Sequence, residues 1–281
     1  EENTGAHACL LSNGAYSIRV TDDGNSAAFL GGCCVYDCRR PDDTLCLRLN
    51  GKKLLPSSGE YAWTLREDHA AWSFEQNGAQ YAVTLAAIDG ELGELIEVQL
   101  RGAGRAELEL SFRPVLAAPR DVESHSAYWK LGMTAQDGEN SILLHRLPKG
   151  DKPGIWLCLA CDHPANFTAD EQGGTKALVS PYLRASVTVT QPRAGQAATL
   201  RFALCIGTDA QSAHDGAARI LASGAYGGSM PDAAAIHLGM NAAELGAAME
   251  LVLPLWRNVL SNAAPQSELW RYGISGDLPV I

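Results

Sequence analysis

The sequence is poor in basic residues and has no long apolar run. Its 22 lysines and arginines are outnumbered by 32 aspartates and glutamates, which gives a formal net charge of -10. Nucleic acids and anionic membrane surfaces bind basic patches, so neither is an expected partner. No apolar stretch approaches the roughly 18 residues of a membrane span, and the first residues lack the basic start and apolar run of a signal peptide. We therefore expect a cytoplasmic protein.

Common catalytic signatures are absent as well. The sequence contains no GxSxG, HExxH or GxxxxGK[ST] motif. Ser275, in Gly-Ile-Ser-Gly-Asp, resembles a nucleophile elbow only superficially, because an elbow is followed by a helix and here Pro279 follows. The histidines are scattered singly. His125 lies among carboxylates and aromatic residues typical of a sugar site, although the edge of a β-sandwich is the favoured interpretation.

The eight cysteines do not follow a zinc-finger pattern. The sharpest candidate is Cys158-Leu-Ala-Cys161-Asp-His163, but it lies in an apolar, strand-like run rather than on a tight turn. Residues three apart on a strand point to opposite faces, so Cys158 and Cys161 cannot share a metal ion. We interpret the cysteines as buried free thiols and expect no metal site.

What the sequence does contain is a long series of short strand-like runs. With 46% apolar residues it can bury a large core. Turn residues such as Asn13-Gly14, Asp23-Gly24 and Asn77-Gly78 separate the runs and predict hairpins. About a dozen strands in roughly 200 residues favour a large antiparallel sandwich of two sheets. The predicted strands are Ala15–Val20, Leu45–Leu49, Lys53–Leu55, Tyr61–Leu65, Ala71–Glu75, Tyr81–Ala87, Leu95–Arg101, Ala106–Pro114, Ser141–Arg146, Ile155–Ala160, Leu183–Gln191 and Thr199–Ile206.

The pattern changes to helical after Gly207. Thr208 or Asp209 can cap a helix that ends near Ser223. A second helix is predicted to begin near Asp232. A longer helix, kinked at Pro254, is predicted over 242–262, because apolar residues recur on one of its faces. That stripe consists of Leu245, Met249, Val252, Trp256 and Val259. We therefore divide the chain into a β-sandwich over 1–207, a helical linker over 208–262 and a last segment over 263–281.

The last segment has the residue types of a sugar-binding site. Arg271 and Asp277 bracket two glycines, and Trp270 precedes them. A carboxylate accepts hydrogen bonds from two vicinal sugar hydroxyls, a guanidinium donates in a planar fork, and an indole offers an apolar face. A surface turn closed by an Arg–Asp ion pair is an equally good interpretation of the residue types alone.

The stretch LWRYGISGDLPVI resembles the opening motif of the catalytic barrel in glycoside hydrolase family 94, formerly glycosyltransferase family 36. LLSNGAYSIRVTDDG resembles the family's first sandwich strands, and RDVESHSAYWKLGMTAQ and ILLHRLPKGDKPGIW resemble two later stretches. The resemblance implies a galactose mutarotase-like β supersandwich, a helical linker and the first residues of an (α/α)6 barrel. By position, it also implies that Arg271 and Asp277 hold the donor sugar.

The family's chemistry sets the remaining expectations. Its inverting phosphorolysis needs one general acid, because inorganic phosphate attacks the anomeric carbon in place of an activated water. The resemblance places that acid and the phosphate-binding residues beyond residue 281, so we expect no catalysis from this chain alone. It implies no cofactor other than phosphate as co-substrate. The implied partners are a β-glucan oligosaccharide or disaccharide, the barrel and a second copy in a homodimer. A stand-alone carbohydrate-binding or assembly module is the alternative.

Overall fold

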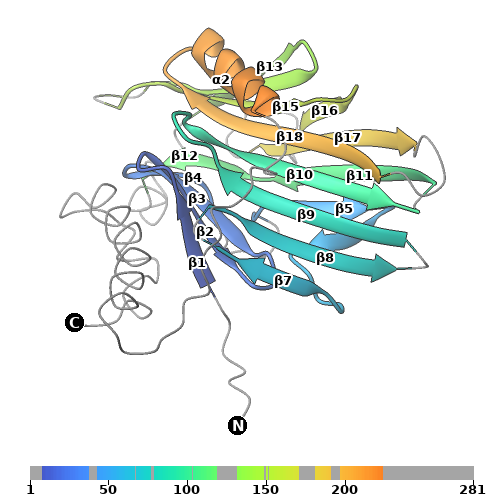
Figure 1. Cartoon of the computed structure of the whole chain (residues 1–281). Coiled ribbons are helices and arrows are strands. Elements are labelled where there is room, and N and C mark those ends of the chain that lie inside the picture. The colour runs from blue at the N-terminus through green and yellow to red at the C-terminus, as the bar shows by residue number, and fades with distance from the viewer. Residues whose placement is uncertain are drawn as a thin grey trace, which may run out of the picture.

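The computed structural model describes residues 8–37, 43–66, 68–76, 79–102, 104–118, 132–148, 150, 152–170, 181–190 and 197–223. Within these residues the chain forms strands β1 to β18 and one helix, α2. The strands pair antiparallel in three sheets (Figure 1). The expected mainly β, antiparallel architecture is confirmed, with three sheets where the sequence pattern predicted two.

The first sheet, here called the N-terminal sheet, has five strands in the order β1-β2-β3-β4-β12. Gly14 follows β1 with a φ of +93°, a backbone conformation that glycine adopts readily. The predicted hairpin at Asp23-Gly24 is confirmed as the β2–β3 pair. The strands are β1 (Ala8–Ser12), β2 (Tyr16–Thr21), β3 (Ser26–Leu30), β4 (Cys33–Tyr36) and β12 (Pro114–Ala117).

The second sheet has eight strands in the order β13-β14-β15-β18-β10-β9-β8-β7. The hairpin predicted around Asn77-Gly78 is confirmed by the pairing of β8 with β9. Its strands are β7 (Ala62–Leu65), β8 (Ala70–Gln76), β9 (Ala79–Ala87), β10 (Gly93–Arg101), β13 (Met133–Gly138), β14 (Ser141–Arg146), β15 (Ile155–Cys161) and β18 (Ala197–Gly207).

The third sheet, here called the β17 sheet, has the order β16-β17-β11-β5-β6. It corrects one expectation, because the predicted strand Ala106–Pro114 is divided between two sheets. β11 ends at Phe112 in the β17 sheet, and β12 begins at Pro114 in the N-terminal sheet. Proline has no N–H for a continuing ladder, and the chain changes sheets there. The strands are β5 (Cys46–Leu49), β6 (Lys52–Leu55), β11 (Arg105–Phe112), β16 (Asn166–Asp170) and β17 (Tyr182–Thr190).

One large hydrophobic core joins the three sheets. Its members come from the N-terminal sheet, the eight-stranded sheet and the β17 sheet, and they include Tyr16, Trp72, Phe112 and Phe202, each at most 1% exposed. The eight-stranded sheet is therefore one layer of the sandwich, and the other two sheets face it (Figure 1). Complete burial of one such side chain stabilises the fold by about 1.5–3 kcal/mol.

Helix α2 (Ala210–Ala222) lies on the other face of the eight-stranded sheet, against β18 and β15 (Figure 1). Its buried residues Ala213, Ala217 and Ile220 pack in a second, smaller cluster with residues of β9, β10, β14, β15 and β18. Asp209 caps it, which confirms the predicted helix start. The rest of the predicted linker and the barrel segment lie outside the described residues.

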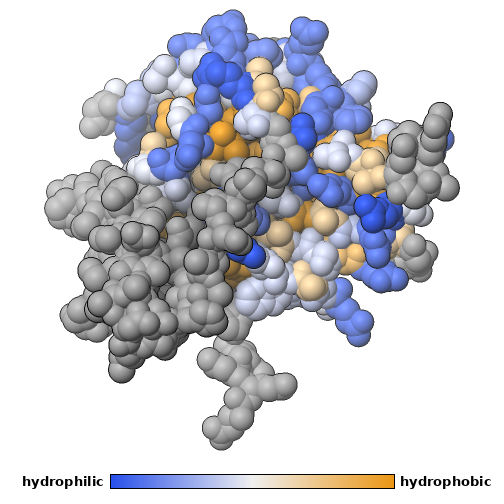
Figure 2. Space-filling view, in the orientation of Figure 1, coloured by the Kyte–Doolittle hydropathy of each residue, from blue (hydrophilic) through white to orange (hydrophobic). Residues whose placement is uncertain are grey.

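The described helix gives no sign of a membrane span. Among the residues that the structure describes, no helix is long and apolar enough to cross a bilayer. In the orientation of Figure 1, hydrophilic residues cover much of the surface and the hydrophobic ones form separated patches (Figure 2).

Candidate functional site

The predicted sugar-binding residues are not among those that the structure describes. Trp270, Arg271 and Asp277 all lie in the stretch 224–281, and His125 lies in the stretch 119–131. Their roles therefore stay predictions. The site below is built from the described residues whose chemistry stands out.

A buried carboxyl group lies where the N-terminal sheet packs on the eight-stranded sheet. Glu94, on β10, is fully buried, as are Tyr16 on β2 and Tyr36 on β4. The Tyr36 hydroxyl lies 3.0 Å from Oε1 and 3.2 Å from Oε2 of Glu94, and the Tyr16 hydroxyl lies 3.2 Å from Oε2. The three residues, here called the Glu94 cluster, join three strands of two sheets.

Burial decides the charge of this cluster. It raises the pKa of Glu94 to about 8, although the hydrogen bonds from Tyr36 and Tyr16 act in the opposite direction. Burial and the nearby Glu94 carboxylate raise the pKa of Tyr16 well above its usual value. At neutral pH the carboxyl group therefore holds its proton, and the cluster is uncharged. A general acid must reach its substrate, so a fully buried Glu94 serves the fold.

Asn13, from the stretch that resembles family 94, also has a structural role. Its side-chain Nδ2 donates to the carbonyls of Ile88, at 2.6 Å, and Glu91, at 2.7 Å. Its Oδ1 accepts from the backbone N–H groups of Ala15, at 3.1 Å, and Tyr16, at 2.8 Å. All the hydrogen-bonding capacity of the amide is used. Asn13 thus fastens the β1–β2 turn to the β9–β10 turn.

The same β9–β10 turn holds helix α2. Arg219 donates from Nε and Nη2 to the two carboxylate oxygens of Glu91, at 2.5 and 2.9 Å. Glycines allow the close contact beneath the helix. A Cβ on Gly93 would lie 2.0 Å from the Leu204 carbonyl oxygen, and one on Gly216 would lie 2.3 Å from the Cys205 Sγ.

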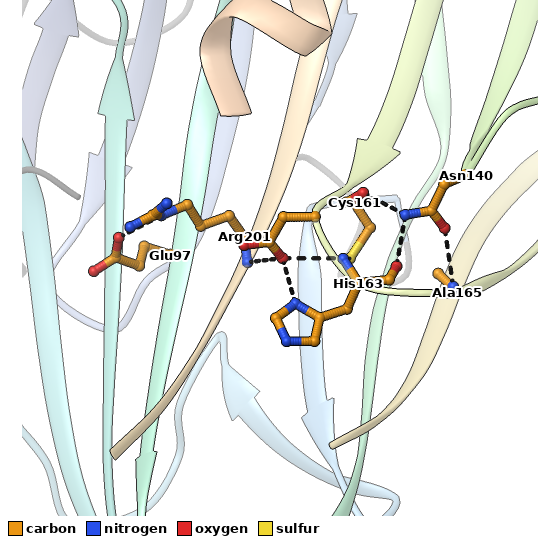
Figure 3. Close-up of polar contacts among 7 residues, drawn as sticks. Glu97, Asn140, Cys161, His163, Ala165 and Arg201 are labelled. Carbon is orange, nitrogen blue, oxygen red and sulfur yellow. Dashed lines mark hydrogen bonds and ion pairs between the residues drawn. The ribbon is translucent and has the colours of Figure 1, made fainter. Parts of the chain in front are cut away.

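A polar group at the end of β15 and on nearby strands of its sheet has the residue types of an acid–base site. Arg201 donates to Glu97 at 2.9 Å from its side chain and to Asp162 Oδ1 at 2.9 Å from its backbone N–H (Figure 3). His163 Nδ1 lies 2.7 Å from the same Asp162 oxygen. Cys161 Sγ accepts from the His163 backbone N–H at 3.5 Å. A Cys–His–Asp arrangement can support nucleophilic catalysis when the thiolate forms.

The thiol of Cys161 does not meet that requirement. Burial raises its pKa to about 12, so the group is a thiol at neutral pH and a poor nucleophile. Asn140 shows what the turn does instead, since its amide donates to the carbonyls of Cys161 and His163 and accepts from the Ala165 N–H (Figure 3). We interpret these contacts as structural, because they hold the β15–β16 turn against the β13–β14 turn.

The prediction that Cys158 and Cys161 point to opposite faces of their strand is confirmed. Cys158 belongs to the cluster beneath α2, whereas Cys161 belongs to the main core on the other face of the sheet. The two thiols therefore cannot share an ion. Within the described part of the chain, no group of three or more His, Cys, Asp or Glu side chains could hold a metal.

Sequence reasoning missed one aromatic pair. His145 and Trp156 are direct neighbours on β14 and β15, with ring centroids 4.0 Å apart and nearly parallel planes. Burial and the charge of Arg146 lower the pKa of His145. On the other side of β15, Trp156 pairs with Gly207 of β18. Gly207 lies directly beneath α2, because a Cβ added to it would lie 2.4 Å from the Ala213 backbone nitrogen. The indole thus lies between His145 and the helix rather than forming an open platform for a sugar.

A comparison with protein-family models finds no match for this chain, and neither does a comparison with curated proteins. Solved structures do resemble it at low identity. A galactose mutarotase-like protein from Lactobacillus casei is 8% identical with a TM-score of 0.49, over 72% of this chain and 100% of that chain. A protein from Escherichia coli K12, described as an aldose 1-epimerase, is 10% identical with a TM-score of 0.47, over 72% of this chain and 99% of that chain.

A longer protein also resembles the chain over part of its length. It comes from the human microbiome and is described as a kojibiose phosphorylase. It is 9% identical with a TM-score of 0.42, and the likeness covers 76% of this chain and 32% of that chain. Membership of family 94 stays a prediction from the sequence.

Proposed function

We propose that this chain is the N-terminal, non-catalytic part of a glycoside phosphorylase or related glycosyltransferase that acts on β-linked glucosides. Trp270, Arg271 and Asp277 form one side of its donor-sugar subsite. The catalytic acid and the phosphate-binding residues belong to a barrel that follows. The parent enzyme transfers a glycosyl unit to inorganic phosphate with inversion, so it needs one acid and no cofactor.

The observation that carries the proposal is the order of the elements. The eighteen strands of the described chain end at Gly207, and helix α2 begins at Ala210. This is the order of sandwich and linker that the resemblance to family 94 implies. Both buried glutamates of β10 already have hydrogen-bond partners. Glu94 is bound by two tyrosines, and Glu97 is bound by Arg201. Neither glutamate is available to a substrate. This favours a structural role for the sandwich over a catalytic one.

A phosphorolysis assay on β-linked glucobioses tests the proposal. The chain alone is expected to release no glucose 1-phosphate, whereas the protein extended by its downstream coding sequence is expected to release it. In the extended protein, Arg271→Ala and Asp277→Asn should each lower kcat/KM by about 10- to 100-fold, because each removes a charge-assisted hydrogen bond to the sugar. Arg105→Ala, at an exposed residue of β11, is the matched control.

Two outcomes would contradict parts of the proposal. Glucose 1-phosphate released by the chain alone would overturn the non-catalytic role. A downstream sequence without a barrel, together with calorimetric binding of a glucobiose to this chain, would favour the stand-alone binding module. Unchanged kinetics in both the Arg271 and the Asp277 variants would remove these residues from the subsite.

A further inference from the structure

The N-terminal sheet has a second apolar face, turned away from the Glu94 cluster. Side chains alternate across a strand. Tyr16, Ile18 and Ala28 point into the main core, so their neighbours in the chain point outward. The cross-strand pairs Ser17↔Phe29 and Arg19↔Ala27 place these residues together on the outer face. Leu10 and Cys34 join them through the pairs Leu10↔Arg19 and Phe29↔Cys34.

This outer face is buried, although neither described core contains it. Leu10 is 7% exposed, Phe29 5%, and Ser17, Ala27 and Cys34 1% each. None of the five belongs to the main core or to the cluster beneath α2. A solvated face of an antiparallel sheet is polar and exposed, so a further layer covers this one. Ser17, Arg19, Phe29 and Cys34 each have an interaction partner beyond the contacts given above.

The end of helix α2 lies close to the β1–β2 turn, at one end of the N-terminal sheet. Arg219 is bound to the Glu91 carboxylate, and the Glu91 carbonyl accepts from Asn13 in the β1–β2 turn of the N-terminal sheet. Ser223, the C-cap residue of α2 and the last residue that the structure describes, follows Arg219 by one turn. The chain that continues from residue 224 therefore starts beside one end of the N-terminal sheet.

We propose that the outer face of the N-terminal sheet is the docking site for the segment 242–262 of the same chain. The stripe Leu245, Met249, Val252, Trp256 and Val259 supplies the apolar surface that the face requires. Five strands spaced about 4.8 Å apart make a face about 19 Å wide, and a helix over 242–262 is about 31 Å long. The other stretches outside the described residues are much shorter, the longest being 119–131.

This docking is independent of the proposed function, because it rests on burial and chain path alone. It gives the N-terminal sheet two roles. Its inner face closes the sandwich, and its outer face fixes the segment that leads to Trp270 and Arg271. The position of those residues would then depend on the sandwich even if they bind no sugar.

Photo-crosslinking of the full chain tests the proposal directly. The amino acid p-benzoylphenylalanine replaces Phe29, the sample is irradiated, and the cross-linked peptides are identified by mass spectrometry. Cross-links to 242–262 are expected. Cross-links confined to 119–131, to residues before Ala8 or to a second copy of the chain would overturn the proposal. The same probe at Ser73, exposed on β8, is the control and should give no cross-link to 242–262.

Hydrogen exchange provides a second readout that does not depend on the probe. Ala27→Glu places a carboxylate on the buried face, and amide exchange in 242–262 is expected to rise at least tenfold. Exchange in β8 and β9, on the far side of the sandwich, should stay at the wild-type rate and shows that the fold persists. Ser73→Glu, the matched control, should change neither region. Wild-type exchange of 242–262 in Ala27→Glu would overturn the proposal.

Discussion

The Glu94 carboxyl and the Tyr36 hydroxyl meet at 3.0 Å in the layer between the N-terminal sheet and the eight-stranded sheet. Both residues are fully buried. Because burial holds the carboxyl group in its neutral form, the contact joins the sheets without a buried charge. The contact therefore ties the stability of the sandwich to pH.

Glu94→Gln is expected to flatten the pH dependence of stability. The pKa of Glu94 is raised to about 8 in the folded chain, whereas an unfolded glutamate has a pKa of about 4.3. Between these values the folded state binds more protons than the unfolded state. The free energy of unfolding therefore falls as pH rises, by up to about 1.4 kcal/mol per pH unit, and the loss is complete above the folded pKa. Glutamine has no such proton.

Urea denaturation at several pH values between 5.5 and 7.5 checks this prediction. The Glu94→Gln profile should slope less than the wild-type profile. Glu75→Gln, at an exposed glutamate on β8, makes the same chemical change outside the core and should keep the wild-type slope. Parallel profiles for wild type and Glu94→Gln would show that Glu94 does not titrate in this range.

Asn13→Ala is expected to lower the free energy of unfolding by about 2–4 kcal/mol. The substitution removes four hydrogen bonds and leaves two carbonyls and two N–H groups without their partner. Asn13→Asp should cost at least as much, because a carboxylate oxygen would face the Ile88 and Glu91 carbonyls in place of the amide N–H donors. Thermal or urea denaturation measures both. Asn166→Ala, at an exposed asparagine of β16, is the control. An equal loss of unfolding free energy in that variant would show that the four hydrogen bonds of Asn13 do not stabilise the fold.

The local parts of this architecture could be predicted from the sequence. Asn77-Gly78, between runs of alternating residues, predicts the β8–β9 hairpin, and Asp209 predicts the start of α2. Both predictions succeed because turns and caps depend on residues that are neighbours in the chain. The division of the strands among three sheets was not predictable in this way. Pro114 marks the change of sheet, but a strand-like pattern runs through it.

The Glu94 cluster could not be predicted because its partners are distant in sequence. Tyr36 is 58 positions from Glu94, and Tyr16 is 78 positions away. β10 carries Glu94 and Glu97 three positions apart, so they face opposite sides of the sheet. Which glutamate enters the core depends on the packing of the N-terminal sheet, which local pattern does not encode. The predicted site around Arg271 and Asp277 lies outside the described residues and stays a prediction.

Three buried thiols and the half-buried thiol of Cys9 are expected to resist modification in the folded protein. Burial raises the pKa of Cys9, Cys158, Cys161 and Cys205 to about 12, so almost no thiolate is present at pH 8. A disulfide reagent such as dithionitrobenzoate, followed by peptide mapping, should label these four at least about 100-fold more slowly in buffer than in denaturant. Fast labelling of Cys158 and Cys205 alone would mean that α2 detaches readily.

Gly216→Ala is expected to loosen helix α2, even though alanine is the better helix former by about 1 kcal/mol. The added methyl group would lie 2.3 Å from the Cys205 Sγ. Cys205 is buried in a close-packed cluster, so we expect the helix to move off the sheet rather than the thiol to rotate away. Labelling of Cys158, beneath the helix, should therefore speed up at least about tenfold, since each 1.4 kcal/mol lost is a factor of ten in the open population. Arg219→Ala should have a smaller effect, because the Arg219 side chain is 61% exposed and solvent screens an exposed ion pair.

A second substitution separates this steric cause from a general loss of stability. Cys205→Ala removes the sulfur atom that the new methyl group meets, and the next atom, Glu91 Oε2, is 3.3 Å from the added Cβ. In the Gly216→Ala/Cys205→Ala double variant, labelling of Cys158 should therefore return toward the rate of Cys205→Ala alone. Additive effects of the two substitutions would show that the contact between Gly216 and Cys205 does not set how closely α2 approaches the sheet.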